Sequence, residues 1–180
     1  GRSKISRLLS SSAYEWFNDV LGSPRYIMAP MVDQSELAFR VLVRENGCDM
    51  CYTQMHHAYN FMRDPKYRDT CIDWLDYAPY NGGSAADAAR SKAIDRPIIA
   101  QFAGDDPETV VEAAQHIQHD VAGCDLNLGC PQKIAKRGNY GAYLLPDTDR
   151  VISILTAMVQ KLDCPVSCKI RKLENDADTL

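Results

Sequence analysis

The chain alternates short apolar segments with amphipathic ones, and this alternation limits its possible folds more than any other feature. Apolar runs of strand length occur at residues 26–31, 50–55, 97–102, 124–128 and 165–170. Between some of these runs, apolar side chains recur at helical spacing, for example over residues 110–117 and 151–159. Nearly continuous apolar strands that alternate with helices are typical of a parallel sheet covered by helices. The sequence therefore predicts an α/β fold of the parallel (β/α) type.

Two helix starts are indicated by local signals. Asp106 and Pro107 occupy the N-cap and first positions of the helix that follows the third predicted strand. Asp33 and Glu36 stand three residues apart, as in a capping box, ahead of a helix that we expect to end at Gly47. Both helices would begin just beyond the carboxyl end of a strand.

Residues 124–141 carry the densest group of chemically useful side chains. The fourth predicted strand ends at Gly129, and Cys130 stands between this glycine and Pro131. Glycine permits unusual φ angles and proline fixes its own, so the thiol should lie on a tight, stiff turn. We expect the upstream Asn127 to share the pocket of Cys130. The cations that follow and should face the same mouth are Lys133, Lys136 and Arg137. A thiol, an amide and three cations at the end of a strand indicate a site that receives a polyanion.

This segment, which begins Cys-Asp-Leu-Asn-Leu-Gly-Cys-Pro-Gln-Lys, resembles the signature of the tRNA-dihydrouridine synthases. The closer resemblance is to the eukaryotic branch that acts near positions 16 and 17 of tRNA, and it extends over residues 12–180. It implies an FMN-binding (β/α)8 TIM barrel that uses NADPH to reduce uridine in the tRNA D-loop to 5,6-dihydrouridine. It also implies that tRNA is the partner and that Cys130 is the general acid.

Chain length limits how much of such a barrel can be present. A complete barrel takes about 250 residues, whereas this chain has 180. We therefore expect an incomplete barrel with about the first five strands, and the alternative is a small sheet with an exposed edge. Residues 1–25 are expected to form a tail with a short helix, and residues 26–180 the N-terminal part of the catalytic domain. Residues 64–95 fit the strand–helix rhythm poorly and read as an insertion.

Reduction of the uracil C5=C6 bond needs a hydride at C6 and a proton at C5. No side chain supplies a hydride, so a cofactor must do so. A thiol is protonated at neutral pH, whereas a carboxylic acid would need a large upward pKa shift to stay protonated there. Cys130 can therefore serve as the acid without an activating base.

A reduced flavin is anionic around N1 and the C2 carbonyl, so it needs a nearby cation and amide groups. Lys169 lies within the fifth predicted strand, and Gln101 within the third. Burying an ammonium is costly unless it is paired, so a lysine in an apolar strand is usually functional. The resemblance implies that both side chains contact the pyrimidine edge of FMN. It also implies that Met31, in the segment Ala29-Pro30-Met31, lies against the ring.

A basic rim is expected around the thiol, because Arg171 extends the fifth strand toward the cations that follow Cys130. With Asn127, these residues would contact the substrate or its RNA, although a cluster of charges can also be a solvated face. The net charge of −4 requires that any RNA contact be a local basic patch on an acidic body. His56 and His57 end the second strand, where they either touch substrate or are structural.

The composition is that of a soluble globular protein, with 46% hydrophobic and 24% charged residues. No apolar run approaches the roughly 20 residues of a membrane span. The seven cysteines and the lack of a secretory signal favour reduced thiols inside the cell, in cytoplasm or nucleus, with the mitochondrion as the alternative. Cys48 and Cys51 have C-x2-C spacing, but no second pair completes a metal site, so none is expected. The oligomeric state is left open.

Three functional hypotheses follow. The first is a tRNA-dihydrouridine synthase. A second flavin barrel, of the dihydroorotate dehydrogenase type, is a weaker rival because the basic residues 132–137 would have no use with a small acid. The third is a catalytically inert half-barrel that acts as an RNA-binding or structural piece. Bound flavin would separate the enzymes from the inert piece.

Overall fold

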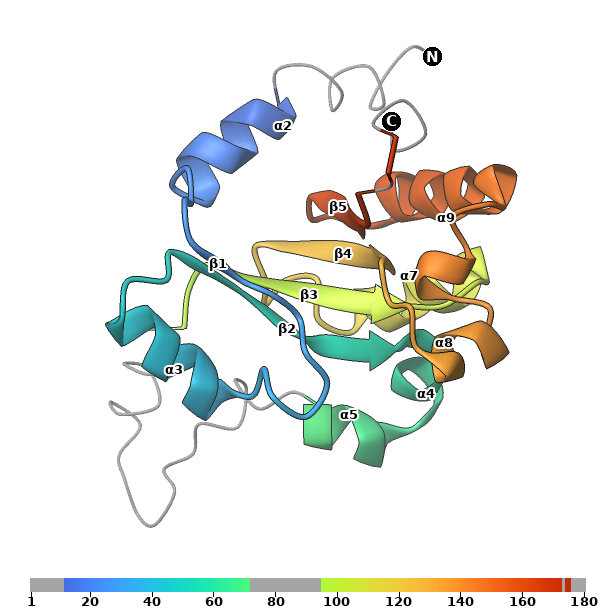
Figure 1. The fold of residues 1–180 in the computed structure, drawn as a ribbon, viewed down its shortest axis with the longest axis horizontal. Helices are drawn as coiled ribbons and strands as arrows, with labels where there is room; N and C mark the ends of the chain where they lie inside the picture. Colours follow the sequence, from blue (N-terminus) through green and yellow to red (C-terminus); the bar gives the residue numbers. More distant parts are fainter. Residues whose placement is uncertain (1–11, 72–94, 173, 176–180) are drawn as a thin grey trace.

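The computed structural model describes residues 12–71, 95–172, 174 and 175, and Figure 1 shows how its elements are arranged. Residues 1–11 of the predicted tail therefore lie outside the described residues, as does most of the predicted insertion at 64–95. No helix among the described residues is long and apolar enough to cross a membrane.

Five parallel strands form one curled sheet, which confirms the predicted fold class (Figure 1). Each strand pairs with the next one along the chain, in the order β1-β2-β3-β4-β5. The strands are β1 (Ile27–Met28), β2 (Met50–His57), β3 (Ile98–Ala103), β4 (Gly123–Leu128) and β5 (Val166–Ile170). This stepwise parallel order is that of the first part of a (β/α)8 barrel.

Helices cover one face of this sheet and enclose the main core. They include α4 (Ala58–Arg63), α7 (Pro107–Gln115) and α9 (Thr148–Lys161). Phe102 and Leu126, which are neighbours in register on β3 and β4, are fully buried against Phe61 of α4 and Met158 of α9 in the same cluster. Each such side chain stabilises the fold by about 1.5–3 kcal/mol through burial.

Helix α7 begins as its local sequence predicts. The Asp106 side chain accepts a hydrogen bond from the Thr109 backbone N–H at 2.8 Å, and Pro107 occupies the first helical turn. The capping box predicted for α3 (Leu37–Glu45) is wrong. Asp33 has φ 59° and donates its backbone N–H to Gln54, so it belongs to the preceding turn instead of the helix start. Gly47, with φ 93°, lies just past the end of α3 as expected.

Strand β1 is shorter than the predicted run at 26–31. The chain leaves the sheet after Met28 because Ser35 holds the next residues in a loop. The Ser35 hydroxyl donates to the Ala29 carbonyl at 3.1 Å and accepts from the Met31 N–H at 2.6 Å. This side-chain pairing replaces ladder hydrogen bonds and turns the chain toward α3.

Short elements complete the described structure. They are α2 (Ser12–Glu15), a π-helical turn (Trp16–Val20), α5 (Pro65–Cys71), α8 (Lys133–Arg137) and a 3₁₀ turn (Gly141–Tyr143). The Trp16 indole N–H donates to the Ala122 carbonyl at 2.9 Å, so the N-terminal segment is attached to the start of β4. Helix α8 and the 3₁₀ turn both follow the carboxyl end of β4.

Candidate active site

Cys130 lies just beyond the carboxyl end of β4, on the side to which the strand arrows point and where α8 lies (Figure 1). Its side chain is partly exposed. In parallel α/β sheets this edge is where ligands bind, because the loops there are free to carry functional groups. The predicted location of the thiol is therefore suited to chemistry.

Asn127 holds the turn that carries the thiol. Its side-chain oxygen accepts hydrogen bonds from the backbone N–H groups of Gly129 and Cys130, at 3.1 and 3.0 Å. Asn127 as a whole residue is buried, with 9% of its surface exposed. The prediction that Asn127 shares the site of Cys130 agrees with this contact, although it is made through the backbone of the cysteine.

Residues 140–143 also hold the turn, and the sequence did not lead us to predict this. The Cys130 carbonyl accepts from the Ala142 N–H at 3.0 Å, and the Tyr143 hydroxyl donates to the Pro131 carbonyl at 2.9 Å. Tyr140 is buried in a small cluster with Ala103 and Ala135, against which Cys130 packs. The available signal was the Asn139-Tyr140-Gly141 segment, whose Asn139 and Gly141 have φ of 51° and 67° and form a tight turn.

A buried polar network lies on the sheet face opposite the main core. Gln101, Asp125 and Ser167 are neighbours in register on β3, β4 and β5, so their side chains share a face. The Asp125 carboxylate accepts from Gln101 Nε2 at 2.8 Å and from Ser167 Oγ at 2.6 Å. Gln101 Oε1 in turn accepts from Asn127 Nδ2 at 2.7 Å.

Asp125 was not predicted as a site residue. It is the fully buried centre of this network. Burial raises the pKa of its carboxyl to about 6, against the opposing effects of the hydrogen bonds from Ser167 and Gln101 and of the Lys169 charge. A carboxylate in this position requires partners, and the network supplies them.

The prediction that Lys169 contacts the flavin is not tested by the described structure, in which its side chain is exposed. Cys168, Lys169 and Ile170 are exposed because β5 forms the edge of the described sheet. Gln101, by contrast, is fully buried with both ends of its amide hydrogen-bonded. A primary amide has two N–H groups and two lone pairs, so Gln101 keeps one of each for a further partner.

The predicted basic residues surround the thiol turn. Lys133, Lys136 and Arg137 are exposed on α8 and line a pocket of about 400 Å³. Arg171 reaches the same turn, because its Nε donates to the Gly129 carbonyl at 3.2 Å. Cations from two separate segments, α8 and the end of β5, therefore follow or contact this turn.

Ala29, Pro30 and Met31 follow β1 and thus lie at the same edge of the sheet as Cys130. Strands β2 and β3 separate β1 from β4. Met31 is partly buried and Ala29 is exposed. These residues share the edge with the thiol, and the described structure places no hydrogen bond between them and the Cys130 turn.

The two histidines at the end of β2 have different surroundings. His56 is fully buried with ring centroids 5.0 Å from Phe61 and 5.6 Å from Phe102, and burial lowers its pKa to about 3. This favours the structural alternative for His56. His57 lies edge-on to Tyr140 at 5.5 Å, which places its ring beside the cysteine turn, and burial also lowers its pKa.

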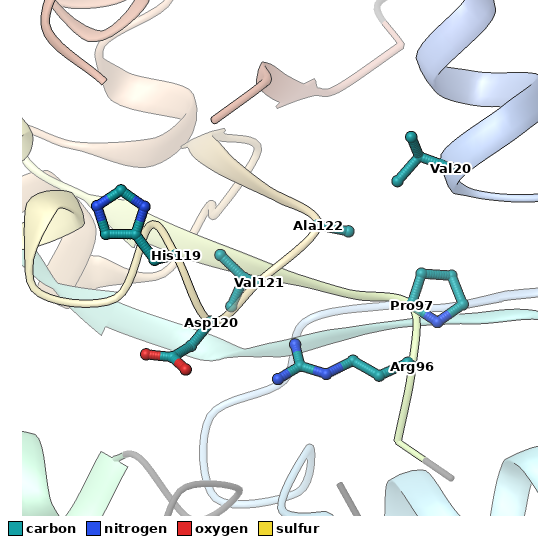
Figure 2. Close-up of a pocket in the computed structure, with 7 residues that line it drawn as sticks. All are labelled: Val20, Arg96, Pro97, His119, Asp120, Val121 and Ala122. Carbon is teal, nitrogen blue, oxygen red and sulfur yellow. The ribbon is translucent and has the colours of Figure 1, made fainter. Parts of the chain in front are cut away.

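A second pocket lies at the opposite edge of the sheet, as Figure 2 shows. It has a volume of about 510 Å³, and its walls come from residues that precede β1, β3 and β4. The lining residues are Val20, Arg96, Pro97, His119, Asp120, Val121 and Ala122. None of the predicted site residues lines it.

Metal-binding side chains do not cluster in the described part of the chain. No group of three or more histidine, cysteine or acidic residues there could hold an ion. Cys48 and Cys51 approach to 3.9 Å between sulfur atoms, but Cys51 is fully buried and both are free thiols.

Comparison with known proteins gives a consistent result. A family model described as dihydrouridine synthase matches residues 27–179. A mouse protein named tRNA-dihydrouridine(16/17) synthase (NAD(P)(+))-like is 44% identical over 158 residues, which cover 88% of this chain and 30% of the mouse protein. The budding yeast tRNA-dihydrouridine(16/17) synthase (NAD(P)(+)) is 40% identical over 85% of this chain and 33% of its own length. A mouse tRNA-dihydrouridine(20a/20b) synthase-like protein is 35% identical over 86% of this chain and 43% of its own length. The chain thus spans about a third of the 16/17-type relatives.

Proposed function

Since the chain belongs to the dihydrouridine synthase family, as its signature segment predicts, we propose that it is part of an enzyme that reduces uridine in tRNA to 5,6-dihydrouridine. Residues 26–180 would be the N-terminal part of the catalytic domain. The names of the 16/17-type relatives favour uridines at positions 16 and 17 of the D-loop. The observation that carries the proposal is the partly exposed Cys130 on a turn held by Asn127, with cations of α8 beside it.

Cys130 is the proposed proton donor to uracil C5. The turn is held on both sides, by Asn127 through the Cys130 N–H and by Ala142 through the Cys130 carbonyl. Holding the backbone at both ends limits where the thiol can point, and a fixed donor is what general acid catalysis requires. Asn127, which lies beside the thiol turn, is the proposed contact to the base.

The residues at this edge of the sheet fit a flavin. Lys169 is an exposed cation suited to the anionic N1 and C2 carbonyl edge, and Met31 offers an apolar surface for the ring. Ala29 and Pro30 would bring the backbone of the β1 loop close to it. Gln101 would reach the pyrimidine edge with its remaining N–H only if a neighbouring group moves, because its side chain is fully buried. When bound, FMN reduced by NADPH would supply the hydride for uracil C6.

The basic residues are the proposed tRNA contacts. Lys133, Lys136, Arg137 and Arg171 surround the thiol turn, and phosphate contacts of this kind fix the register of an RNA without reading its sequence. A local basic patch is the arrangement that an acidic chain needs in order to bind a polyanion. These contacts would orient the D-loop so that one uridine enters beside Cys130.

The experiment is a modification assay with the full-length natural protein. Unmodified tRNA, NADPH and FMN are added, and dihydrouridine is measured by mass spectrometry of nuclease fragments. We expect dihydrouridine in the D-loop fragment only when NADPH is present. A protein that binds tRNA but carries no flavin and forms no dihydrouridine would instead be the inert RNA-binding piece. A flavoprotein that oxidises NADPH but leaves tRNA unchanged would contradict the proposed substrate.

A further inference from the structure

A continuous hydrogen-bonded chain connects the buried Asp125 to the backbone of the cysteine turn. It runs from the Asp125 carboxylate through the Gln101 amide to the Asn127 amide, with N···O distances of 2.8 and 2.7 Å. Asn127 then accepts from the N–H groups of Gly129 and Cys130. Asp125 precedes Asn127 by two residues on β4, so both side chains lie on the same face of the sheet. Asp125 is fully buried, so a substrate would not touch it.

The direction of every bond in this chain follows from the chemistry of its first member. An ionised carboxylate can only accept hydrogen bonds. Gln101 must therefore turn its Nε2 toward Asp125, which leaves its Oε1 facing Asn127. Asn127 must then turn its Nδ2 toward Gln101, and only this orientation leaves its Oδ1 free to accept from the Gly129 and Cys130 N–H groups. With both amides reversed, the Asn127 NH2 group would face those two backbone donors.

We propose that Asp125 is a positioning residue, which fixes the orientation of the Gln101 and Asn127 amides and thereby holds the Cys130 turn. The proposal rests on the proposed function only in giving Cys130 the role of proton donor. The hydrogen-bonded chain itself is a property of the folded protein. Asp125 acts through Gln101 and Asn127 and touches neither substrate nor flavin.

Asp125→Asn in the full-length natural protein is the first test. Asparagine keeps the size of the side chain, but it offers an NH2 group as well as an oxygen. The amides of Gln101 and Asn127 can then both reverse. In the reversed molecules the Asn127 oxygen no longer accepts from the Gly129 and Cys130 N–H groups. We expect hydrogen exchange of the Gly129 and Cys130 amides, measured by NMR, to become at least about tenfold faster. Ser167→Ala is the matched control, since it removes the other side-chain donor to Asp125 and leaves the orientation of Gln101 unchanged.

The double variant Asp125→Asn/Asn127→Asp is the decisive test. The carboxylate introduced at position 127 would accept from both backbone N–H groups and from Gln101, and the reversed Gln101 amide would accept from the NH2 group introduced at position 125. Every hydrogen bond between positions 125, 101 and 127 is then restored, with donor and acceptor exchanged in each. We expect exchange at Gly129 and Cys130 to return to within about threefold of wild type. A residue that merely fills space at position 125 would not be rescued by a change at position 127.

The outcomes separate clearly. Wild-type exchange in a folded Asp125→Asn variant would overturn the proposal, and so would a double variant that stays unprotected. If Asp125→Asn alone fails to fold, the double variant still decides, because it restores every hydrogen bond: wild-type exchange supports the proposal, and unfolding or fast exchange overturns it. The readout needs neither flavin nor tRNA. A protein that makes no dihydrouridine but shows this exchange pattern would contradict the proposed function and still support the positioning role of Asp125.

Discussion

Gly141 lies so close to Cys130 that a side chain at position 141 would collide with it. A Cβ built on Gly141 would come within 2.6 Å of the Cys130 carbonyl oxygen and 2.9 Å of the Cys130 Cβ. Gly141 also has φ 67°, in the left-handed region that favours glycine. The chain that follows α8 therefore packs directly against the backbone of the thiol turn.

Gly141→Ala should displace the Cys130 turn. Gly47→Ala is the matched control, because Gly47 has φ 93° but nothing within 4 Å of an added Cβ. The control should lower the free energy of unfolding by about 1–2 kcal/mol through backbone strain alone. Gly141→Ala should cost about 1–3 kcal/mol more, because overpacking adds to that strain. Urea denaturation of both variants measures the difference, and equal losses would contradict the close approach.

The stability of the protein should depend on the ionisation of Asp125. Its pKa is raised from 3.8 to about 6 by burial. Below pH 4 the carboxyl is protonated in both folded and unfolded chains. Between pH 4 and 6 the folded chain keeps a proton that the unfolded chain has released, so the free energy of unfolding falls as pH rises. The loss is complete about one pH unit above the folded pKa and is on the order of 3 kcal/mol.

Comparing Asp125→Asn with wild type isolates this effect. The titratable neighbours of Asp125 are Lys169 and Cys168 on β5, Tyr52 on β2 and Cys124 on β4, and none of them is a carboxyl or an imidazole. The stability of the variant relative to wild type should therefore rise from pH 4 to about one pH unit above the folded pKa and then stay level. Parallel curves over that range would show that the carboxyl titrates normally.

The basic residues of α8 should bind tRNA through phosphates. Replacing Lys133, Lys136 and Arg137 by alanine should weaken tRNA binding. It should also flatten the dependence of log K on log salt by up to about 2–3, since each phosphate contact contributes about 0.7–0.9 to the slope. The matched control replaces Arg25, Lys66 and Lys161, which are exposed on other parts of the molecule. Equal salt slopes for the two triple variants would show that the α8 residues are solvated surface charges that do not contact phosphates.

Lys169→Met should weaken flavin binding and leave the fold intact. The side chain is exposed in the described sheet, so its replacement removes no packing there, whereas the flavin loses its cation. We expect affinity for reduced FMN to fall about tenfold or more, the usual size of a charge-assisted hydrogen bond. Lys172→Met removes the same charge three positions further along and serves as the control. Wild-type affinity in Lys169→Met, measured by fluorescence titration, would remove Lys169 from the flavin site.

Local signals predicted the parts of the structure that depend on neighbours in sequence. The start of α7 followed from Asp106 and Pro107, and the position of Cys130 followed from the glycine and proline that flank it. Whether a strand residue is buried depends instead on which strands flank it, and Lys169 is exposed because β5 is the edge of the described sheet. An apolar strand reads alike whether it lies in the middle or at an edge of the sheet.

Asp125 illustrates the other limit of sequence reasoning. Its partners Gln101 and Ser167 are 24 and 42 residues away, so only the register of three strands brings them together. A signal was nevertheless present, because an acid within an apolar strand demands partners as much as a lysine does. Applying to residue 125 the argument that singled out Lys169 would have identified it.

The role of Cys130 as proton donor is tested most directly by Cys130→Ala in the full-length natural protein. The protein is reduced with NADPH without oxygen, mixed with unmodified tRNA and sampled for dihydrouridine over one turnover. Cys48→Ser, at the opposite end of the sheet, is the control and should behave as wild type. We predict that Cys130→Ala keeps wild-type flavin reduction by NADPH and tRNA binding, while dihydrouridine forms about 10²–10⁴-fold more slowly. Dihydrouridine formation at the wild-type rate by Cys130→Ala would contradict the assignment of the thiol as the acid.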